Sequence, residues 1–252
     1  MPRLARRDVW IRWLQYWLVH GFRQATGKLA KTDVLDAEVI ALFAARMDIE
    51  EHAPLSANAQ KLRDDSSRRR QLVEMQVQER NRLKRCHDSD SKKSINKVLD
   101  LLEEERQALE ERMLNLVKKD QDLQHKMDIL TSIPGIGDIV ALTLVSDMPE
   151  LGSINDKQAA SLAGLAPQDR QSGLRNRKAS IRGGRKYVRT AMYMAAISAK
   201  KYNPAIRPFY ERLVQNGKPK MVALTASMRK LLIQANQLLM ENRKWTNIKI
   251  HS

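Results

Sequence analysis

Cysteine, clustered histidine and long apolar runs are what this 252-residue sequence lacks. Cys86 is the only cysteine, so the chain can form neither an internal disulfide nor a cysteine-based zinc site. The five histidines are scattered without metal-ligand spacing. No apolar run approaches the roughly 18 residues that a membrane-spanning helix needs. These absences favour a cytoplasmic protein.

Acidic residues are few relative to basic ones. The chain has 45 Lys and Arg against 29 Asp and Glu, which gives a formal net charge of +16. An excess of this size favours a phosphate-rich partner whose binding weakens as salt rises. Ribosomal, chromatin and recombination proteins share this property. The charge therefore predicts a class of partner and leaves the activity open.

The basic segment, residues 170–189, carries much of this excess. Eight of its twenty residues are Lys or Arg, and two serines and three glycines lie between them. Such a composition predicts a loop that closes on a polyanionic backbone before the chain enters a packed helix. The residues predicted to contact nucleic-acid phosphates here are Arg170, Arg175, Arg177, Lys178, Arg182, Arg185 and Lys186. Ser172, which Gly173 follows, is the first candidate nucleophile.

A pair of aspartates forms a second candidate site. Asp33 and Asp36 are three residues apart, so on a helix both carboxylates share one face. Their mutual repulsion would be relieved by a divalent metal ion. A structural role competes, with Asp33 as a helix N-cap and Asp36 as a first-turn acid favoured by the helix dipole. The spacing alone leaves both roles open.

The middle of the chain is highly charged and almost free of proline and glycine. Two arms, residues 62–83 and 95–130, are separated by a polar tip at residues 86–94. Apolar residues in the second arm recur at steps of three and four, which predicts an antiparallel helical hairpin or a dimerising coiled coil. Arg106 and Asp120 interrupt this seam, and we expect them to disfavour other registers or to pair across it.

A tight turn is predicted at Pro134-Gly135-Ile136-Gly137, directly before a helix. Backbone amides at Gly135 and Gly137 would then hold a nucleic-acid phosphate, as in a helix-hairpin-helix turn. A purely structural turn between helices is the alternative.

Helices are predicted near the C-terminus over residues 187–200, 208–215 and 221–242. The last carries an apolar stripe from Met221 to Leu238 that is expected to face the core.

Three passages in combination resemble one family. They are GKLAKTDVLDAEVIA (27–41), SIPGIGDIVALTLVSDMPE (132–150) with LAGLAPQDRQSG (162–173), and GKPKMVALTASMRKLLIQANQLL (217–239). Over roughly residues 20–245, and in this order, they resemble the DEDD insertion-sequence transposases, a group that includes the Piv-type DNA invertases.

The resemblance implies a mainly α fold in three parts. Residues 1–53 would form a partial RuvC-like α/β domain, and residues 54–130 a long antiparallel or dimeric coiled coil. Residues 131–252 would form a C-terminal helical transposase domain that contains the serine loop and the helix-hairpin-helix-like turn.

The same resemblance assigns roles to single residues. Asp33 and Asp36 match the last two Mg²⁺-binding acids of the family, in its K-T-D-x-x-D-A context. Pro167, Ser172 and Gly173 match the P-x-x-x-x-S-G context of the family's proposed nucleophile, and Ser180 lies outside it. The partners implied are DNA, a structured guide RNA and further copies of the chain, as a dimer or tetramer through the coiled coil.

The sequence departs from the family before Asp33. Only 32 residues precede it, and Asp8 is the sole acid among them. The first two acids of the family's set have no counterpart there, so we expect the first half of the RuvC-like domain to be missing. Two functions therefore stay open. The chain is a transposase or site-specific recombinase, or it is a non-catalytic basic helical protein that binds nucleic acid and dimerises through its coiled coil.

Overall fold

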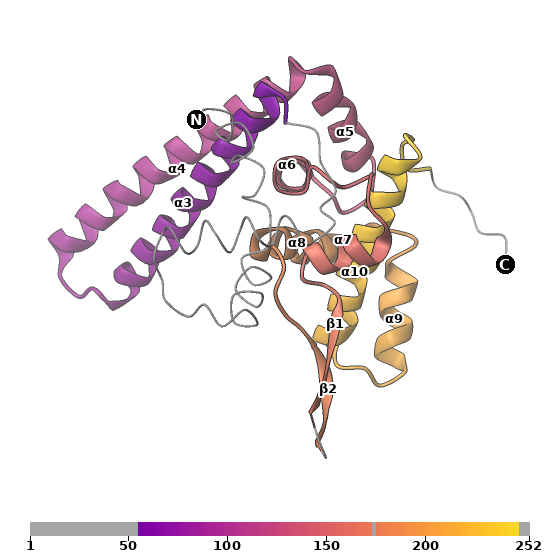
Figure 1. Cartoon of the computed structure of the whole chain (residues 1–252). Coiled ribbons are helices and arrows are strands. Elements are labelled where there is room, and N and C mark those ends of the chain that lie inside the picture. Colours follow the sequence, from indigo (N-terminus) through magenta and orange to yellow (C-terminus); the bar gives the residue numbers. More distant parts are fainter. Residues whose placement is uncertain (1–54, 173–174, 247–252) are drawn as a thin grey trace, which may run out of the picture. The chain divides into compact units, whose positions relative to one another are not determined.

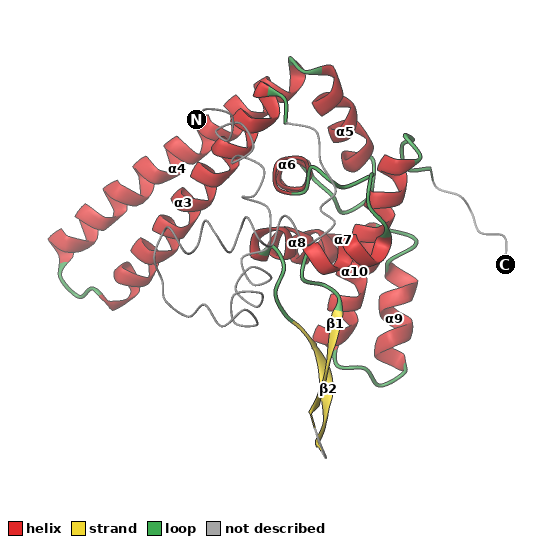
Figure 2. Cartoon of the chain, in the orientation of Figure 1, coloured by secondary structure: helices red, strands yellow, loops and turns green. Residues whose placement is uncertain are grey.

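The computed structural model describes residues 55–172 and 175–246, with the backbone alone for residues 168–172 and 175–180. These residues belong to one compact unit, Leu55–Ser252. Within the described ranges the chain forms helices α3 to α10 and one two-stranded sheet (Figures 1 and 2). The predicted mainly α fold is confirmed.

A long helical hairpin opens the described chain. Helices α3 (Ala57–Arg85) and α4 (Ser89–Lys118) run antiparallel along their length and project away from the other helices (Figure 1). Each begins at a side-chain cap, because Ser56 Oγ accepts from the Ala59 amide and Asp88 Oδ2 accepts from the Ser91 amide. Only residues 86–88 separate the two helices. The antiparallel hairpin predicted from the sequence is confirmed, with a shorter tip.

The predicted second arm is wrong in one respect, because it breaks at Asp120. Helix α4 ends at Lys118, and α5 (Gln121–Thr131) begins after Asp120, whose carboxylate accepts from the Leu123 amide at 3.2 Å. The same carboxylate accepts from Asn58 Nδ2 at 2.9 Å, at the start of α3. Asp120 therefore pairs across the hairpin, which is one of the two roles expected of it, while it also caps a new helix.

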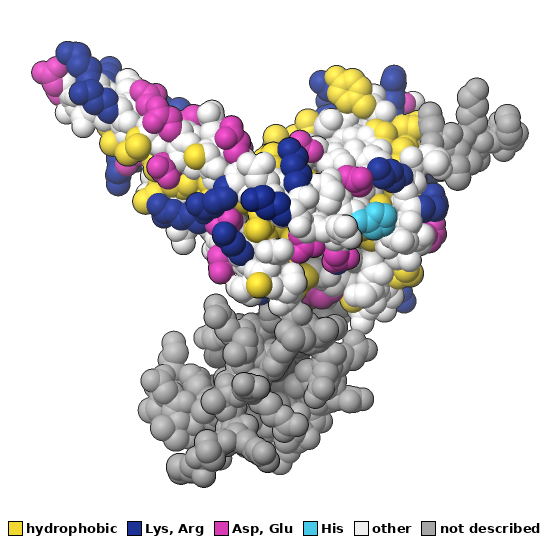
Figure 3. Space-filling view, turned by 90° about the horizontal axis from the view of Figure 1, so that it is seen from above, with side chains coloured by type: hydrophobic (Ala, Val, Ile, Leu, Met, Phe, Trp, Pro, Cys, Tyr) yellow, Lys and Arg dark blue, Asp and Glu magenta, His cyan; other side chains and the backbone are white. Residues whose placement is uncertain are grey.

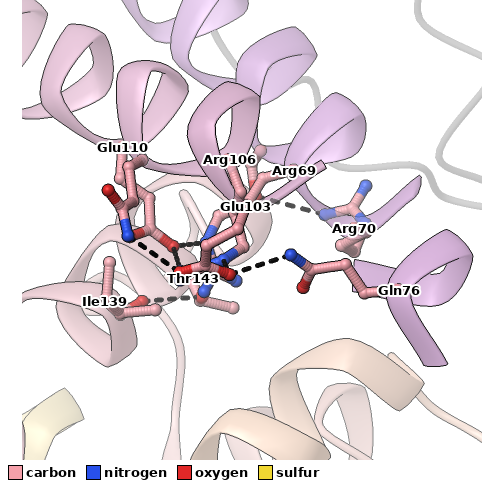
Figure 4. A network of polar contacts seen from close by, with 10 residues as sticks. Arg69, Arg70, Gln76, Glu103, Arg106, Glu110, Ile139 and Thr143 are labelled. Carbon is pink, nitrogen blue, oxygen red and sulfur yellow. Dashed lines mark hydrogen bonds and ion pairs between the residues drawn. The ribbon is translucent and has the colours of Figure 1, made fainter. Parts of the chain in front are cut away.

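Arg106, the other polar residue in the seam, binds within its own helix. Its guanidinium pairs with Glu103 and Glu110 of α4, one turn away on either side (Figure 4). Those two glutamates make the contacts across the hairpin, since Glu103 accepts from Gln76 at 2.9 Å and Glu110 pairs with Arg69 at 2.6 Å. Arg106 thus orients the acids that fix the register of α3 on α4.

Helix α6 (Asp138–Asp147) lies at the centre of the unit and contacts α3, α5 and α8. Its residues are apolar on nearly every side, as expected of a helix that other elements enclose. Small side chains of α8 (Lys186–Tyr202), namely Ala195, Ala196 and Ala199, are fully buried and permit close packing. Val188 and Met192 are also fully buried and anchor the first half of α8, where the basic segment ends.

The last helix, α10 (Lys220–Met240), packs on α8, α5, α7 (Asp156–Leu162) and α9 (Arg207–Gln215). Its predicted apolar stripe is buried from Leu224 to Leu238. Met221 is wrong as a core residue, because it lies in the first turn of α10 and is 59% exposed. The carboxamide of Asn236 is buried and bonds to Gly152 N and Ile154 O, both at 2.8 Å.

The predicted basic loop is wrong as a description of the backbone. Strands β1 (Pro167–Ser172) and β2 (Arg175–Ile181) pair antiparallel, and we call them together the basic hairpin. It extends from the helical body between α7 and α8 (Figure 2). No helix in the described part of the chain is long and apolar enough to cross a membrane.

Candidate functional site

The strand register places the candidate nucleophile among arginines. Ser172 lies opposite Arg175, and Arg170 lies opposite Arg177. Directly opposed residues of an antiparallel pair occupy the same face, and positions two apart along a strand also share a face. Ser172, Arg170, Arg175 and Arg177 therefore fall on one face of the basic hairpin.

A bulge separates this part of the basic hairpin from its base. The register shifts between Gln168 and Arg170, so that Lys178 and Ala179 together oppose Asp169. Lys178 consequently falls outside the alternation that groups the three arginines. Ser180 pairs with Gln168 on the base side of the bulge. The two serines of the basic segment thus lie at different ends of the same hairpin.

Two glycines allow the hairpin to leave the helical body. Gly164 and Gly184 both have left-handed φ values, +67° and +63°. A Cβ added to Gly184 would lie 2.5 Å from Gly164 Cα and 2.8 Å from the carbonyl oxygen of Leu162. That carbonyl accepts from the Arg185 amide at 2.7 Å. The ends of the hairpin therefore cross so closely that only glycine fits.

Arg185 has a structural partner that the sequence did not indicate. Its guanidinium forms two hydrogen bonds to Glu150, at 2.8 and 2.6 Å, and one to the carbonyl oxygen of Asp147 at 2.7 Å. This charge-assisted, bidentate pair joins the end of the basic hairpin to the segment after α6. Arg182 and Lys186, on either side, are exposed.

Tyr187 connects the start of α8 to the helical hairpin. Its hydroxyl donates to Glu74 of α3 at 2.9 Å, and the guanidinium of Arg70 lies 4.6 Å from its ring centroid. Arg70 also pairs with Asp147, which is 9% exposed. The nearby carboxylate of Glu74 raises the pKa of Tyr187. The segment that follows the basic hairpin is therefore tied to α3 and α6 through Arg185 and Tyr187.

The two glycines of the predicted phosphate-binding turn differ in role. A Cβ on Gly135, whose φ is +106°, would lie 2.6 to 2.9 Å from atoms of Ala199, so this glycine lets the turn pack against α8. Gly137 is exposed, with open space around it, and is the N-cap of α6 without a side-chain cap. Of the two glycines, Gly137 has the exposed position at a helix N-terminus that the predicted phosphate contact needs, and that contact stays a prediction.

Asp33 and Asp36 lie outside the described residues, so the structure does not place them relative to Ser172. Among the described residues, no three His, Cys, Asp or Glu side chains gather in a way that could hold a metal ion.

Charges of both signs are interspersed over the helical hairpin, which is the arm on the left of Figure 3. Such mixing is typical of a solvated surface rather than of a phosphate-binding one. Most of the net positive charge lies elsewhere in the sequence, since residues 167–252, which include the basic hairpin and the helices after it, contain 19 Lys and Arg against three acids.

Two transposase families match this chain. One, described as the IS116/IS110/IS902 transposase family, matches residues 127–211. The other, a transposase family of the DEDD type, matches residues 6–89. The second match begins before residue 20, where the resemblance seen in the sequence began.

Curated relatives agree with these matches. The pilin gene-inverting protein of Moraxella bovis is 30% identical over 241 residues, which cover 92% of this chain and 73% of that protein. The pilin gene-inverting protein of Moraxella lacunata is 30% identical over 243 residues, with the same coverage. A 43.6 kDa protein of the insertion element IS110 from Streptomyces coelicolor is 31% identical over 134 residues, 52% of this chain and 32% of its own length.

Proposed function

The chain belongs to the IS116/IS110/IS902 family of transposases, and on this premise we propose that it breaks and rejoins DNA strands with Ser172 as nucleophile. Family membership itself supports DNA recombination of the insertion-sequence kind. The nucleophilic role of Ser172, and the metal ion and partners named below, are proposals beyond family membership.

One observation supports this step most strongly: the register of the basic hairpin. It puts Ser172 and three arginines on one face, with Arg170 directly opposite Arg177. Like charges opposite one another destabilise a strand pair. A phosphodiester bound at that face would relieve the repulsion and would lie next to the serine. The hairpin is thus suited to bind the group that the serine would attack.

The proposed reaction conserves phosphoester bonds. The Ser172 hydroxyl loses its proton and forms a bond to phosphorus, and the bond from phosphorus to one deoxyribose oxygen breaks. The released oxygen takes up a proton, and the protein is left joined to DNA through a phosphoserine. Attack by another strand's hydroxyl on this linkage reverses the step and joins the strands. Arginines of the hairpin would stabilise the charge that develops on the phosphate.

Asp33 and Asp36 are the proposed Mg²⁺ ligands. Carboxylate oxygens are the donors that Mg²⁺ prefers, and two aspartates of this kind suit that ion. When bound, Mg²⁺ would lower the cost of negative charge on the reacting oxygens. Because these aspartates lie outside the described residues, no geometry between them and Ser172 is part of the proposal.

Further partners follow from charge and exposed apolar surface. The net charge of +16 suits polyanionic partners, and the family resemblance implies two of them, DNA and a structured guide RNA. The outer half of the helical hairpin leaves large apolar side chains exposed: Met75, Val77, Val98 and Leu101. We propose that they pack against a second copy of the chain, giving a dimer or tetramer.

Strand cleavage by serine variants tests the proposal. Ser172→Ala is expected to abolish Mg²⁺-dependent cleavage of DNA from the element's end, with DNA retention in a filter or gel assay nearly unchanged. Ser180→Ala is the matched control, because it removes the other hydroxyl of the same hairpin, and it should cleave normally. Cleavage that survives in Ser172→Ala would contradict the assignment.

The competing function is nucleic-acid binding without catalysis. It predicts that neither the unmodified chain nor any variant cleaves DNA, with or without RNA, although all of them still bind DNA. Cleavage by the unmodified chain and its loss in Ser172→Ala would exclude that function.

A further inference from the structure

The segment from the end of α8 into α10 carries positive charge that has no role in the proposed reaction. Residues 200–230 contain eight Lys and Arg and one acid, Glu211. Glu211 already pairs with Arg207 at 3.0 Å. The remaining basic side chains of this stretch form no ion pair within the part of the chain that the structure describes. The excess is therefore not neutralised within the fold.

Two of these cations meet at one aromatic ring. Lys230 Nζ of α10 lies 4.6 Å from the ring centroid of Phe209 in α9, and Arg212 Cζ lies 5.7 Å from the same centroid. We call these three residues the Phe209 cluster. The hydrogen bond that Lys230 makes to protein is to the carbonyl oxygen of Ala205, at 3.3 Å. The cluster holds two positive charges and no carboxylate.

Holding two cations together has a cost that the fold does not offset with an acid. Burial of the Lys230 ammonium and the nearby charge of Arg212 both lower the pKa of Lys230. Cation–π attraction to Phe209 keeps both groups in place but does not neutralise either. An anion near these two groups would offset the repulsion, and the ring already holds both donors in position.

The geometry favours a phosphate over a nucleobase. Phe209 is half-buried, and its ring is already in contact with two cationic groups, so a base would have to displace them in order to stack. Lys200, 5.4 Å from the ring centroid of Tyr210, continues the same kind of contact toward α8. Guanidinium and ammonium groups held in this way suit backbone phosphate oxygens, which carry no sequence information.

We propose that the Phe209 cluster binds the phosphodiester backbone of duplex DNA, as a second contact separate from the basic hairpin. In Figure 1 the C-terminal end of α9 and the basic hairpin both extend toward the bottom of the view. The inference rests on the proposed function for the identity of the polyanion. It concerns where DNA is held and is independent of which residue attacks it.

The salt dependence of binding tests this site. For B-DNA, the slope of log K against log salt falls in magnitude by about 0.9 for every phosphate that the protein no longer neutralises. The double variant Arg212→Gln/Lys230→Gln in the full chain should therefore lower the slope for a labelled duplex of arbitrary sequence by about 2. Phe209→Leu keeps the charge and should weaken binding by a smaller factor. Removing two cations that repel each other should leave the unfolding temperature unchanged or higher.

A charge-matched control separates a local site from overall charge. Lys93→Gln/Lys126→Gln removes two cations from α4 and α5 that pair with Asp90 and Asp122 at 2.9 and 3.0 Å. An unchanged slope in Arg212→Gln/Lys230→Gln would overturn the inference, as would an equal reduction of the slope in the control. A change seen with a hairpin RNA of similar length, and not with duplex DNA, would also overturn it. Cleavage through Ser172 could still be observed in each of these cases.

Discussion

At the scale of single residues, Gly164 and Gly184 determine where the basic hairpin leaves the helical body. Both adopt left-handed φ values, and their backbones approach each other more closely than any side chain would allow. An isolated two-stranded hairpin is only marginally stable. The crossing at its base, together with the Arg185–Glu150 pair, is therefore what holds this one in position.

Gly184→Ala should displace the base of the basic hairpin. The new methyl group would meet the backbone of Gly164, in addition to the roughly 1–2 kcal/mol that an L-residue loses in the left-handed region. Gly217→Ala is a matched control, since its φ is +75° and nothing lies within 4 Å of its added Cβ. We expect a larger loss of stability in urea unfolding for Gly184→Ala, and faster trypsin cleavage within residues 170–182. Equal effects of the two variants would contradict this account.

Single residues also show where sequence patterns fail. Asp120 occupies a seam position in the three-four pattern, yet its carboxylate caps α5 and so ends the preceding helix. A side-chain oxygen that bonds to an amide three residues on competes with helix continuation. The signal was present in the sequence, since aspartate is among the preferred N-cap residues, but the apolar periodicity masked it.

At the scale of elements, the register of the helical hairpin depends on charge as well as on apolar contacts. Hydrogen bonds from Arg106, Gln107 and Gln76 lower the pKa of Glu103 from 4.5 to about 2. A carboxylate whose pKa is lower in the folded than in the unfolded chain stabilises the fold at pH values above its pKa in the unfolded chain. That stabilisation is present above pH 4.5 and is lost as the pH falls from 4.5 toward about 2.

Glu103→Gln should reduce the acid sensitivity of the fold. The glutamine does not titrate, so the drop in unfolding temperature between pH 4.5 and about 2 is expected to be smaller than in the unmodified chain. Glu104→Gln, at an exposed neighbour without an ion pair in the described part of the chain, serves as control. An acid sensitivity that is unchanged in Glu103→Gln, or reduced as much in Glu104→Gln, would be inconsistent with this role.

Helices were predictable from the sequence, and the basic hairpin was not. Apolar periodicity is strong in α4 and α10, because each buries an apolar face, whereas the buried residues of α3 include Asp65, Ser66 and Gln76. The strands of the basic hairpin have no such pattern, and they contain Pro, Asp, Asn and Lys, which are depleted in strands. The charge of this segment predicted nucleic-acid binding, but the sequence did not predict that the segment forms two strands.

At the scale of the whole molecule, the helical hairpin is unevenly covered. Its buried apolar residues are Leu62, Leu72, Leu109, Met113 and Val117, which lie in its inner half. Beyond them Val98 and Leu101 are 42% and 57% exposed. A two-helix arm with apolar surface of this kind is expected to find cover in another copy of the chain.

Val98→Glu/Leu101→Glu should weaken self-association. Loss of about 1.5–3 kcal/mol for each apolar side chain that a partner would bury corresponds to at least a tenfold weaker dimer. Met194→Glu, at an equally exposed residue of α8, should leave association unchanged. Sedimentation velocity over a range of concentrations measures both. Association that is unaffected by the double variant would place the contact elsewhere.

The candidate site itself was only partly accessible from sequence. The motif around Ser172 selected one serine, and the register then showed which arginines share its face. The sequence indicated neither the engagement of Arg185 with Glu150 nor the packing role of Gly135 against Ala199, because both depend on contacts between distant segments. The metal-binding role of Asp33 and Asp36 stays a prediction.

If Ser172 is the nucleophile, it forms a covalent bond to DNA that can be trapped during the reaction. The full chain would be incubated with labelled DNA from the element's end, its RNA and Mg²⁺, then denatured, digested and analysed by mass spectrometry. We expect a nucleotide attached to the peptide that contains Ser172, and its loss in Ser172→Ala but not in Ser180→Ala. Cleavage without any protein–DNA adduct, or an adduct on another residue, would contradict it.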